Sequence, residues 1–64
     1  MNIEDADLGD VVKDARGIVW HVVGLDYVGL PRKKGPLVVL SRPGQWDHRH
    51  VDQKEFAEFT RVDA

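Results

Sequence analysis

Apolar, β-branched runs separated by short polar turns dominate the hydrophobic pattern of this chain. The longest run, Gly17–Leu30 (GIVWHVVGLDYVGL), is rich in Val, Trp and Tyr, a composition that favours a strand over a helix. Alternation in its first half places Ile18, Trp20 and Val22 on one apolar face. We therefore predict one long strand with Trp20 at the centre of the core.

A glycine should bend this strand, and a loop should follow it. Gly24 interrupts the run, and a glycine inside a strand commonly marks a bulge or bend, which would turn Leu25 or Tyr27 toward the inner face. After the strand, the segment Leu30–Pro36 (LPRKKGP) combines two prolines, a glycine and three consecutive cations. This composition predicts a loop.

Four shorter strands are expected around the long one. The same criteria place them at Gly9–Asp14, Pro36–Ser41, Trp46–Val51 and Ala57–Val62. Tight turns should join them at Asp14–Gly17 (DARG) and Arg42–Gln45 (RPGQ). In the second turn a proline presets φ and a glycine supplies a positive φ, which is typical of a type II turn.

A single helical turn should precede the last strand. Asp52 is a candidate N-cap, and Glu55 follows at the spacing of a capping box. So few residues follow that we expect one turn of 3₁₀-helix, with Phe56 plugging one end of the core.

Five strands on so short a chain predict an all-β fold closed into a small barrel, because closure removes exposed edges. A helical turn before the last strand makes the order of elements over Leu8–Val62 resemble the SH3-like barrel. The stretch GDVVKDARGIVWHVVGL also resembles the opening of small SH3-like and KOW-like proteins of bacteria and bacteriophages. We expect residues 1–7 to form a flexible acidic lead-in anchored by Leu8, and residues 8–64 a single domain.

Composition and charge narrow the class of protein. The chain has 64 residues, no cysteine and a net charge of −2, so thiolate chemistry and disulfides are excluded. Residues 1–26 carry six acidic and two basic side chains, whereas residues 27–64 carry five acidic and seven basic ones. The basic excess in residues 27–64 is smaller than the strongly basic charge that is typical of dedicated nucleic-acid binders. Without an apolar run long enough for a membrane span, we expect a cytoplasmic protein, in the host cytoplasm if it is viral.

Chemistry is weakly indicated. His48, His50 and Asp52 share one face of a strand, but the pattern specifies no complete ligand set, so no metal is predicted. The hydroxyl nucleophile candidates are Ser41 and Thr60, and Ser41 precedes a turn, where a hydroxyl normally bonds to nearby backbone. Nothing in the pattern positions an oxyanion hole. We expect neither an enzyme nor a cofactor.

Binding is the better-supported hypothesis, with a protein as the partner. The hairpin SRPGQWDHRH should present Arg42, Trp46, His48, Arg49 and His50 at one rim, because a fixed turn displays aromatic and arginine side chains at low entropic cost. Tyr27 would form the other side of this surface. In the alternative interpretation, Trp46 covers the mouth of the barrel instead of binding.

Two alternative functions remain open at this point. The basic loop, with Arg32, Lys33 and Lys34, could join Arg42 and Arg49 as a patch that binds nucleic acid in the manner of KOW-like modules. Alternatively, the chain is a structural subunit, either of a homo-oligomer or of a larger viral assembly.

Overall fold

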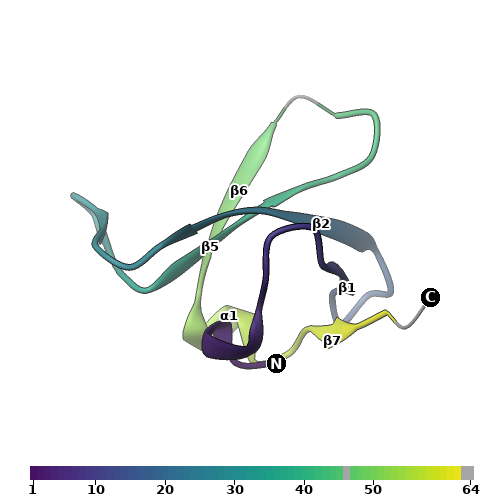
Figure 1. Cartoon of the computed structure of the whole chain (residues 1–64), viewed down its shortest axis with the longest axis horizontal. Helices are drawn as coiled ribbons and strands as arrows, with labels where there is room; N and C mark the ends of the chain where they lie inside the picture. The colour runs from purple at the N-terminus through teal and green to yellow at the C-terminus, as the bar shows by residue number, and fades with distance from the viewer. Residues whose placement is uncertain (46, 63–64) are drawn as a thin grey trace.

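A computed structural model of the chain describes residues 1–45 and 47–62. In chain order its elements are η1 (Ile3–Asp5), β1 (Val11–Lys13), β2 (Val19–Asp26), β3 (Gly29–Leu30), β4 (Lys33–Lys34), β5 (Leu37–Ser41), β6 (His48–Asp52), α1 (Gln53–Phe56) and β7 (Thr60–Arg61). Strands dominate, which confirms the all-β prediction in its broad sense (Figure 1).

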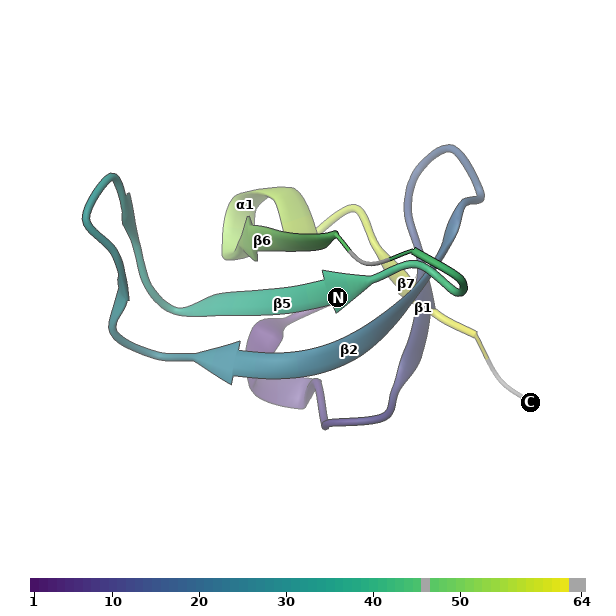
Figure 2. The same cartoon turned by 90° about the horizontal axis from the view of Figure 1, so that it is seen from above.

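Five strands form one antiparallel sheet in the order β6-β5-β2-β1-β7. The sheet curves strongly, as the bend of β2 in Figure 2 shows, but it is not closed into a barrel: within the described ranges, β6 and β7 are its two edges. The closure that we predicted does not form, because β7 has only two residues and offers too short an edge for β6 to pair along. The chain passes from one edge to the other through α1.

The long strand follows its predicted pattern. Val22 is buried, and Val19 and Val23 on the opposite face are 39% and 47% exposed. The register with β5 shifts between Val22 and Gly24, which confirms the predicted irregularity. Beyond the shift Leu25 packs against the core, whereas Tyr27 does not turn inward.

The segment predicted as a basic loop contains a strand. Lys33 and Lys34 form β4, which pairs with β3 in a small second sheet. Asp26 enables this hairpin, because its Oδ1 accepts hydrogen bonds from the backbone N–H groups of Val28 and Gly29, both at 3.0 Å. The bonds from Gly29 and Val28 lower the pKa of the Asp26 carboxyl from its ordinary value of 3.8. Desolvation opposes this shift, and the nearby charge of His50 adds to it. We call residues 26–36 the arm, since they extend beyond the body of the molecule (Figure 2).

The helical turn is capped as predicted. Asp52 Oδ1 accepts a hydrogen bond from the Glu55 N–H at 2.9 Å. The turn is α-helical, with Ala57 N–H bonding to the Gln53 carbonyl at 2.9 Å, and not the 3₁₀ turn that we expected. Phe56 is fully buried, as a core position requires, and its ring centroid lies 5.3 Å from that of Phe59.

The core differs from the prediction at Trp20. Its fully buried or nearly buried members are Ile3, Ala6, Val12, Val22, Val38, Leu40, Val51, Phe56 and Phe59. Trp20 is only partly buried and packs against this cluster from outside. The inner face at Trp20 is left open because the sheet does not close there, and Phe56 is instead the largest fully buried side chain among the described residues.

The acidic N-terminal segment packs onto the body instead of being anchored at Leu8. Leu8 is 67% exposed, whereas Ile3 and Ala6 are 1% and 3% exposed. The Ile3 N–H donates to Gln53 Oε1 at 2.7 Å, and the Met1 amine donates to the Phe59 carbonyl at 2.9 Å. Figure 1 shows this purple segment beside α1. Sequence pattern missed it because two apolar residues among acids form no periodic run.

Candidate functional site

A cleft of about 450 Å³ opens beside Trp20, between β6, α1 and the turn that joins β1 to β2. Its lining combines charged groups with an aromatic floor: Asp14, Ala15, Arg16, Ile18, Trp20, Arg42, Arg49, Glu55, Glu58 and Phe59. A smaller depression of about 190 Å³ under the β5–β6 hairpin shares Trp20, Arg42 and Arg49 with it. These three side chains therefore stand where the two hollows meet.

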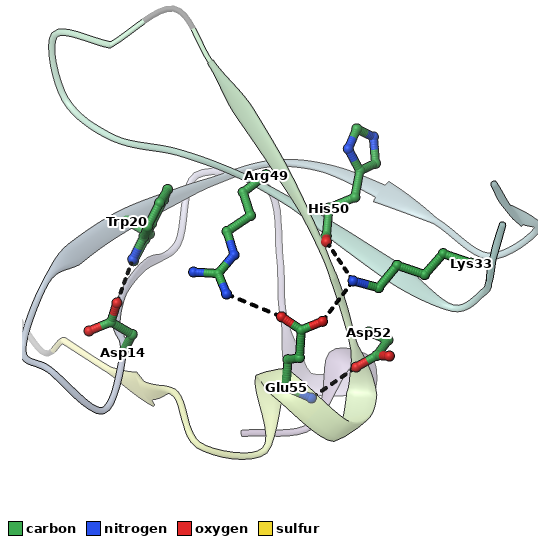
Figure 3. Close-up of polar contacts among 7 residues, drawn as sticks. All are labelled: Asp14, Trp20, Lys33, Arg49, His50, Asp52 and Glu55. Atoms are coloured by element: carbon green, nitrogen blue, oxygen red, sulfur yellow. Dashed lines mark hydrogen bonds and ion pairs between the residues drawn. The ribbon is translucent and has the colours of Figure 1, made fainter.

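The indole of Trp20 is held by polar groups on its edge and cations over its ring. Its Nε1–H donates to Asp14 Oδ2 at 3.2 Å. The guanidinium carbons of Arg42 and Arg49 lie 5.8 and 5.6 Å from the ring centroid, within the range of cation–π attraction. Figure 3 shows Arg49 reaching from β6 into the cleft, with Trp20 and Asp14 across from it. Two guanidinium groups thus converge on one aromatic ring.

Asp14 organises the turn beneath the indole. Its Oδ1 accepts hydrogen bonds from the backbone N–H groups of Arg16 and Ile18, at 2.9 and 3.0 Å. The Gly17 N–H bonds to the Asp14 carbonyl at 3.0 Å, and Gly17 has φ +82°, which confirms the predicted tight turn. Partial desolvation raises the pKa of the Asp14 carboxyl, but these hydrogen bonds, the bond from Trp20 and the charge of Arg16 outweigh it. The pKa therefore lies below its ordinary value of 3.8.

This lowered pKa predicts an acid transition at the cleft. The stabilisation that ionised Asp14 provides is complete above pH 3.8 and is lost as pH falls through its lower folded pKa. We expect the fluorescence of Trp20, measured in a Trp46→Phe background, to change over that range. Asp14→Asn is the control, because its single amide oxygen can still accept the Arg16 and Ile18 bonds, whereas its NH₂ group, which does not titrate, replaces the acceptor of the Trp20 indole. The same transition in Asp14→Asn would assign it to other carboxyls.

Glu55 holds Arg49 in place. Its two carboxylate oxygens accept from Lys33 Nζ at 2.7 Å and from Arg49 Nη2 at 3.1 Å (Figure 3). Lys33 Nζ also donates to the His50 carbonyl at 3.2 Å. Single ion pairs at this exposure add little stability, but together these contacts restrict where the Arg49 guanidinium can lie. By contrast, Arg16 and Arg42 take part in none of the ion pairs within residues 1–45 and 47–62.

The structure brings together only part of the predicted binding rim. Arg42, His48 and Arg49 line the cleft or the adjoining depression. His50 lies on the other face of β6, where its ring points away from Arg49 (Figure 3). Trp46, with both interpretations of it, lies outside the described residues.

Tyr27 does not form the other side of this rim. Along β2 and β5, His21 pairs with Ser41 next to the Arg42 turn, whereas Asp26 pairs with Leu37 at the opposite end. Tyr27 follows Asp26 and so belongs to the arm, where it is 65% exposed. The prediction was wrong because most of the length of β2 separates Tyr27 from the Arg42 turn.

Of the three cations of the arm, Lys33 lies beside an arginine, because it shares the Glu55 carboxylate with Arg49. Lys33 is half-buried and turns toward Glu55, which neutralises it. Arg32 and Lys34 are exposed on either side of it. Because alternate residues of a strand point to opposite faces, the run of charges is divided.

Sequence reasoning missed Trp20 and Asp14 as site residues. The apolar neighbours of Trp20 suggested a central core position, and Asp14 was considered only as the first residue of a turn. The available signal was their proximity: an indole N–H half-buried near the end of a strand needs an acceptor, and the turn that begins with Asp14 supplies one.

Other chemistry has little geometric support in the described part of the chain. No three His, Cys, Asp or Glu side chains there are grouped so that they could hold a metal ion. The Ser41 hydroxyl donates to the neighbouring Arg42 carbonyl at 3.5 Å, the local bonding expected before a turn. None of the described helices has the length and apolar character needed to cross a bilayer.

Comparisons with known proteins leave the site to be interpreted from its own geometry. No family model, no curated protein and no solved structure matches this chain.

Proposed function

We propose that the protein is a non-enzymatic interaction module whose cleft binds an acidic segment of a protein partner. The observation that carries the proposal is the convergence of Arg42 and Arg49 on the exposed side of Trp20. Arginine forms strong, often bidentate hydrogen bonds with carboxylates, and arginine and tryptophan are the residues most enriched at binding hot spots.

We also propose that the domain is an open variant of the SH3-like barrel. In support, the five strands of the main sheet follow one another as neighbours in chain order, and the last one, β7, pairs with the first, β1. The helical turn α1 stands between the last two strands of that sheet, at the position that suggested the resemblance. In this interpretation the short β1–β2 turn leaves the cleft uncovered.

A protein partner fits the charges better than a nucleic acid does. Asp14, Glu55 and Glu58 line the same cleft as the arginines, so a chain of phosphates would meet repulsion as well as attraction. A segment with one or two carboxylates meets less of this repulsion and can pair with Arg42, which takes part in none of the ion pairs among the described residues. The chain as a whole is also acidic, with a net charge of −2.

Three blocked peptides of one design test this function. They are Ac-Thr-Glu-Thr-Glu-Thr-Glu-NH₂ and its counterparts with Gln or Lys in place of Glu, each titrated to millimolar concentration into ¹⁵N-labelled protein. We expect the Glu peptide alone to shift the Trp20 indole N–H resonance. Equal shifts with the Gln peptide would contradict the proposal, and a shift caused instead by oligo-dT, lost at high salt, would favour the nucleic-acid alternative.

Arg42→Ala should weaken binding of the Glu peptide by about tenfold or more, because a hydrogen bond between charged groups contributes about 1.5–3 kcal/mol. The matched control is Arg32→Ala, which removes the same charge from the arm, outside the cleft lining. Dissociation constants from the same titrations provide the comparison. If both variants weaken binding equally, the attraction depends on overall charge and not on the cleft.

A further inference from the structure

Strand β6 is an open edge of the main sheet. It pairs with β5 through Leu40 opposite Arg49 and Val39 opposite His50, and no other described strand lies on its far side. Edge strands present unpaired backbone N–H and C=O groups, which are a template for another chain. Which groups of β6 are unpaired follows from the hydrogen bonds of the strands beside it.

Along each strand the backbone groups of successive residues point to alternate sides, and the hydrogen bonds of β2 fix this direction. The Val22 N–H donates to the Asp10 carbonyl at 2.9 Å, and the Val22 carbonyl accepts from the Gly9 N–H at 2.9 Å, so Val22 bonds toward β1. Leu40 lies opposite Val22 on β5. In an antiparallel pair of strands, a residue whose backbone groups bond away from the partner strand stands opposite a residue whose groups also bond away. The backbone groups of Leu40 therefore bond toward β6.

The same rule continues into β6. Arg49, opposite Leu40, bonds back to β5, so its neighbours His48 and His50 direct their backbone groups to the open edge. The Lys33 amine bound to the His50 carbonyl at 3.2 Å agrees with this direction. That lysine occupies one carbonyl, and the pattern leaves the His50 N–H and both backbone groups of His48 for a partner.

The side chains along this edge indicate the chemistry of such a partner. A strand added beside β6 would place every second side chain on the face of Arg49, which lines the cleft with Arg42 and Trp20. Its other side chains would lie beside His48 and His50. Acidic residues on the cleft side would meet Arg42, which takes part in none of the described ion pairs, and Arg49, which is paired with Glu55.

We propose that the partner segment binds as a short β-strand on the edge of β6, with its acidic side chains in the cleft. This inference rests on the proposed function and adds the mode of binding, β-strand addition. Main-chain hydrogen bonds at His48 and His50 provide affinity, and the arginines select for carboxylates. The added strand lies beside β6, on the side where the sheet has no other described strand.

Amide hydrogen exchange distinguishes this mode from side-chain binding alone. In the whole protein saturated with the Glu peptide, we expect exchange of the His50 amide to slow about tenfold or more. The Arg49 amide, already bonded to β5, is the internal control and should change little. Binding of the Glu peptide without protection at His50 would overturn strand addition and leave the proposed function standing.

N-methylated peptides provide the second readout. One Glu peptide is methylated on the three Thr nitrogens and another on the three Glu nitrogens, so each loses the N–H groups of one edge. Only one of them should bind about tenfold or more weakly: the Thr-methylated peptide if the added strand is antiparallel, the Glu-methylated peptide if it is parallel. Equal affinities of the two methylated peptides would overturn the inference, whereas failure of the unmethylated Glu peptide to bind would overturn the proposed function as well.

Discussion

Phe56→Ala is expected to leave most of the protein unfolded at room temperature. The side chain is fully buried and packs against Phe59, with the two rings tilted and their centroids 5.3 Å apart. Truncating a buried phenylalanine costs about 3–5 kcal/mol, and a domain of this size rarely has more than about 3–5 kcal/mol of net stability. Circular dichroism with thermal melting measures the loss directly.

Two controls make the comparison specific. Val28→Ala removes an aliphatic side chain that is 90% exposed on the arm, so its melting temperature should remain that of the wild type. Trp20→Ala should lose less stability than Phe56→Ala, because the indole is only partly buried, yet it should abolish binding of the Glu peptide. A Phe56→Ala protein that melts close to the wild type would show that the core is centred elsewhere.

The second large effect is expected at Gly29, in the turn of the arm. Its φ is +94°, and a Cβ there would overlap the Gly35 backbone nitrogen and stand 2.6 Å from the Lys33 carbonyl oxygen. The left-handed conformation alone costs an L-residue about 1–2 kcal/mol, and the overlap forces β3 and β4 apart. We expect Gly29→Ala to lose the β3–β4 hairpin.

Gly44→Ala is the matched control for Gly29→Ala. Gly44 also has a positive φ, +77°, but nothing lies within 4 Å of a Cβ placed there. It should therefore show the conformational cost without the overlap. The measurement is the set of nuclear Overhauser contacts between Gly29 and Lys34, which pair in the hairpin. Hairpin contacts that survive in Gly29→Ala would show that the arm rearranges at little cost.

Much of the fold follows from local sequence. The strand of alternating apolar residues, the register shift beside Gly24 and the Asp52 cap were all predicted, and all are present. The Arg42–Gln45 turn forms as expected, with the Gln45 N–H bonded to the Arg42 carbonyl at 3.1 Å and Gly44 at positive φ. Each of these features depends on residues within a few positions along the chain, so the side-chain pattern contains the information that specifies it.

The candidate site was only partly predictable. Arg42, His48 and Arg49 were identified because a Pro-Gly turn presents its neighbours to solvent. Tyr27 was assigned to the same surface because sequence alone does not show at which end of a sheet a residue lies.

Other features were decided only by tertiary structure. Ile3 enters the core by packing against α1 from the far end of the chain, and Lys33 leaves the basic run to reach Glu55. Trp20 became the floor of a cleft, and not the centre of the core, because β7 is too short for the sheet to close around it. Local pattern specifies which face of a strand is apolar. Whether that face is then covered depends on segments distant in sequence, and their packing energy appears only once the whole chain is folded.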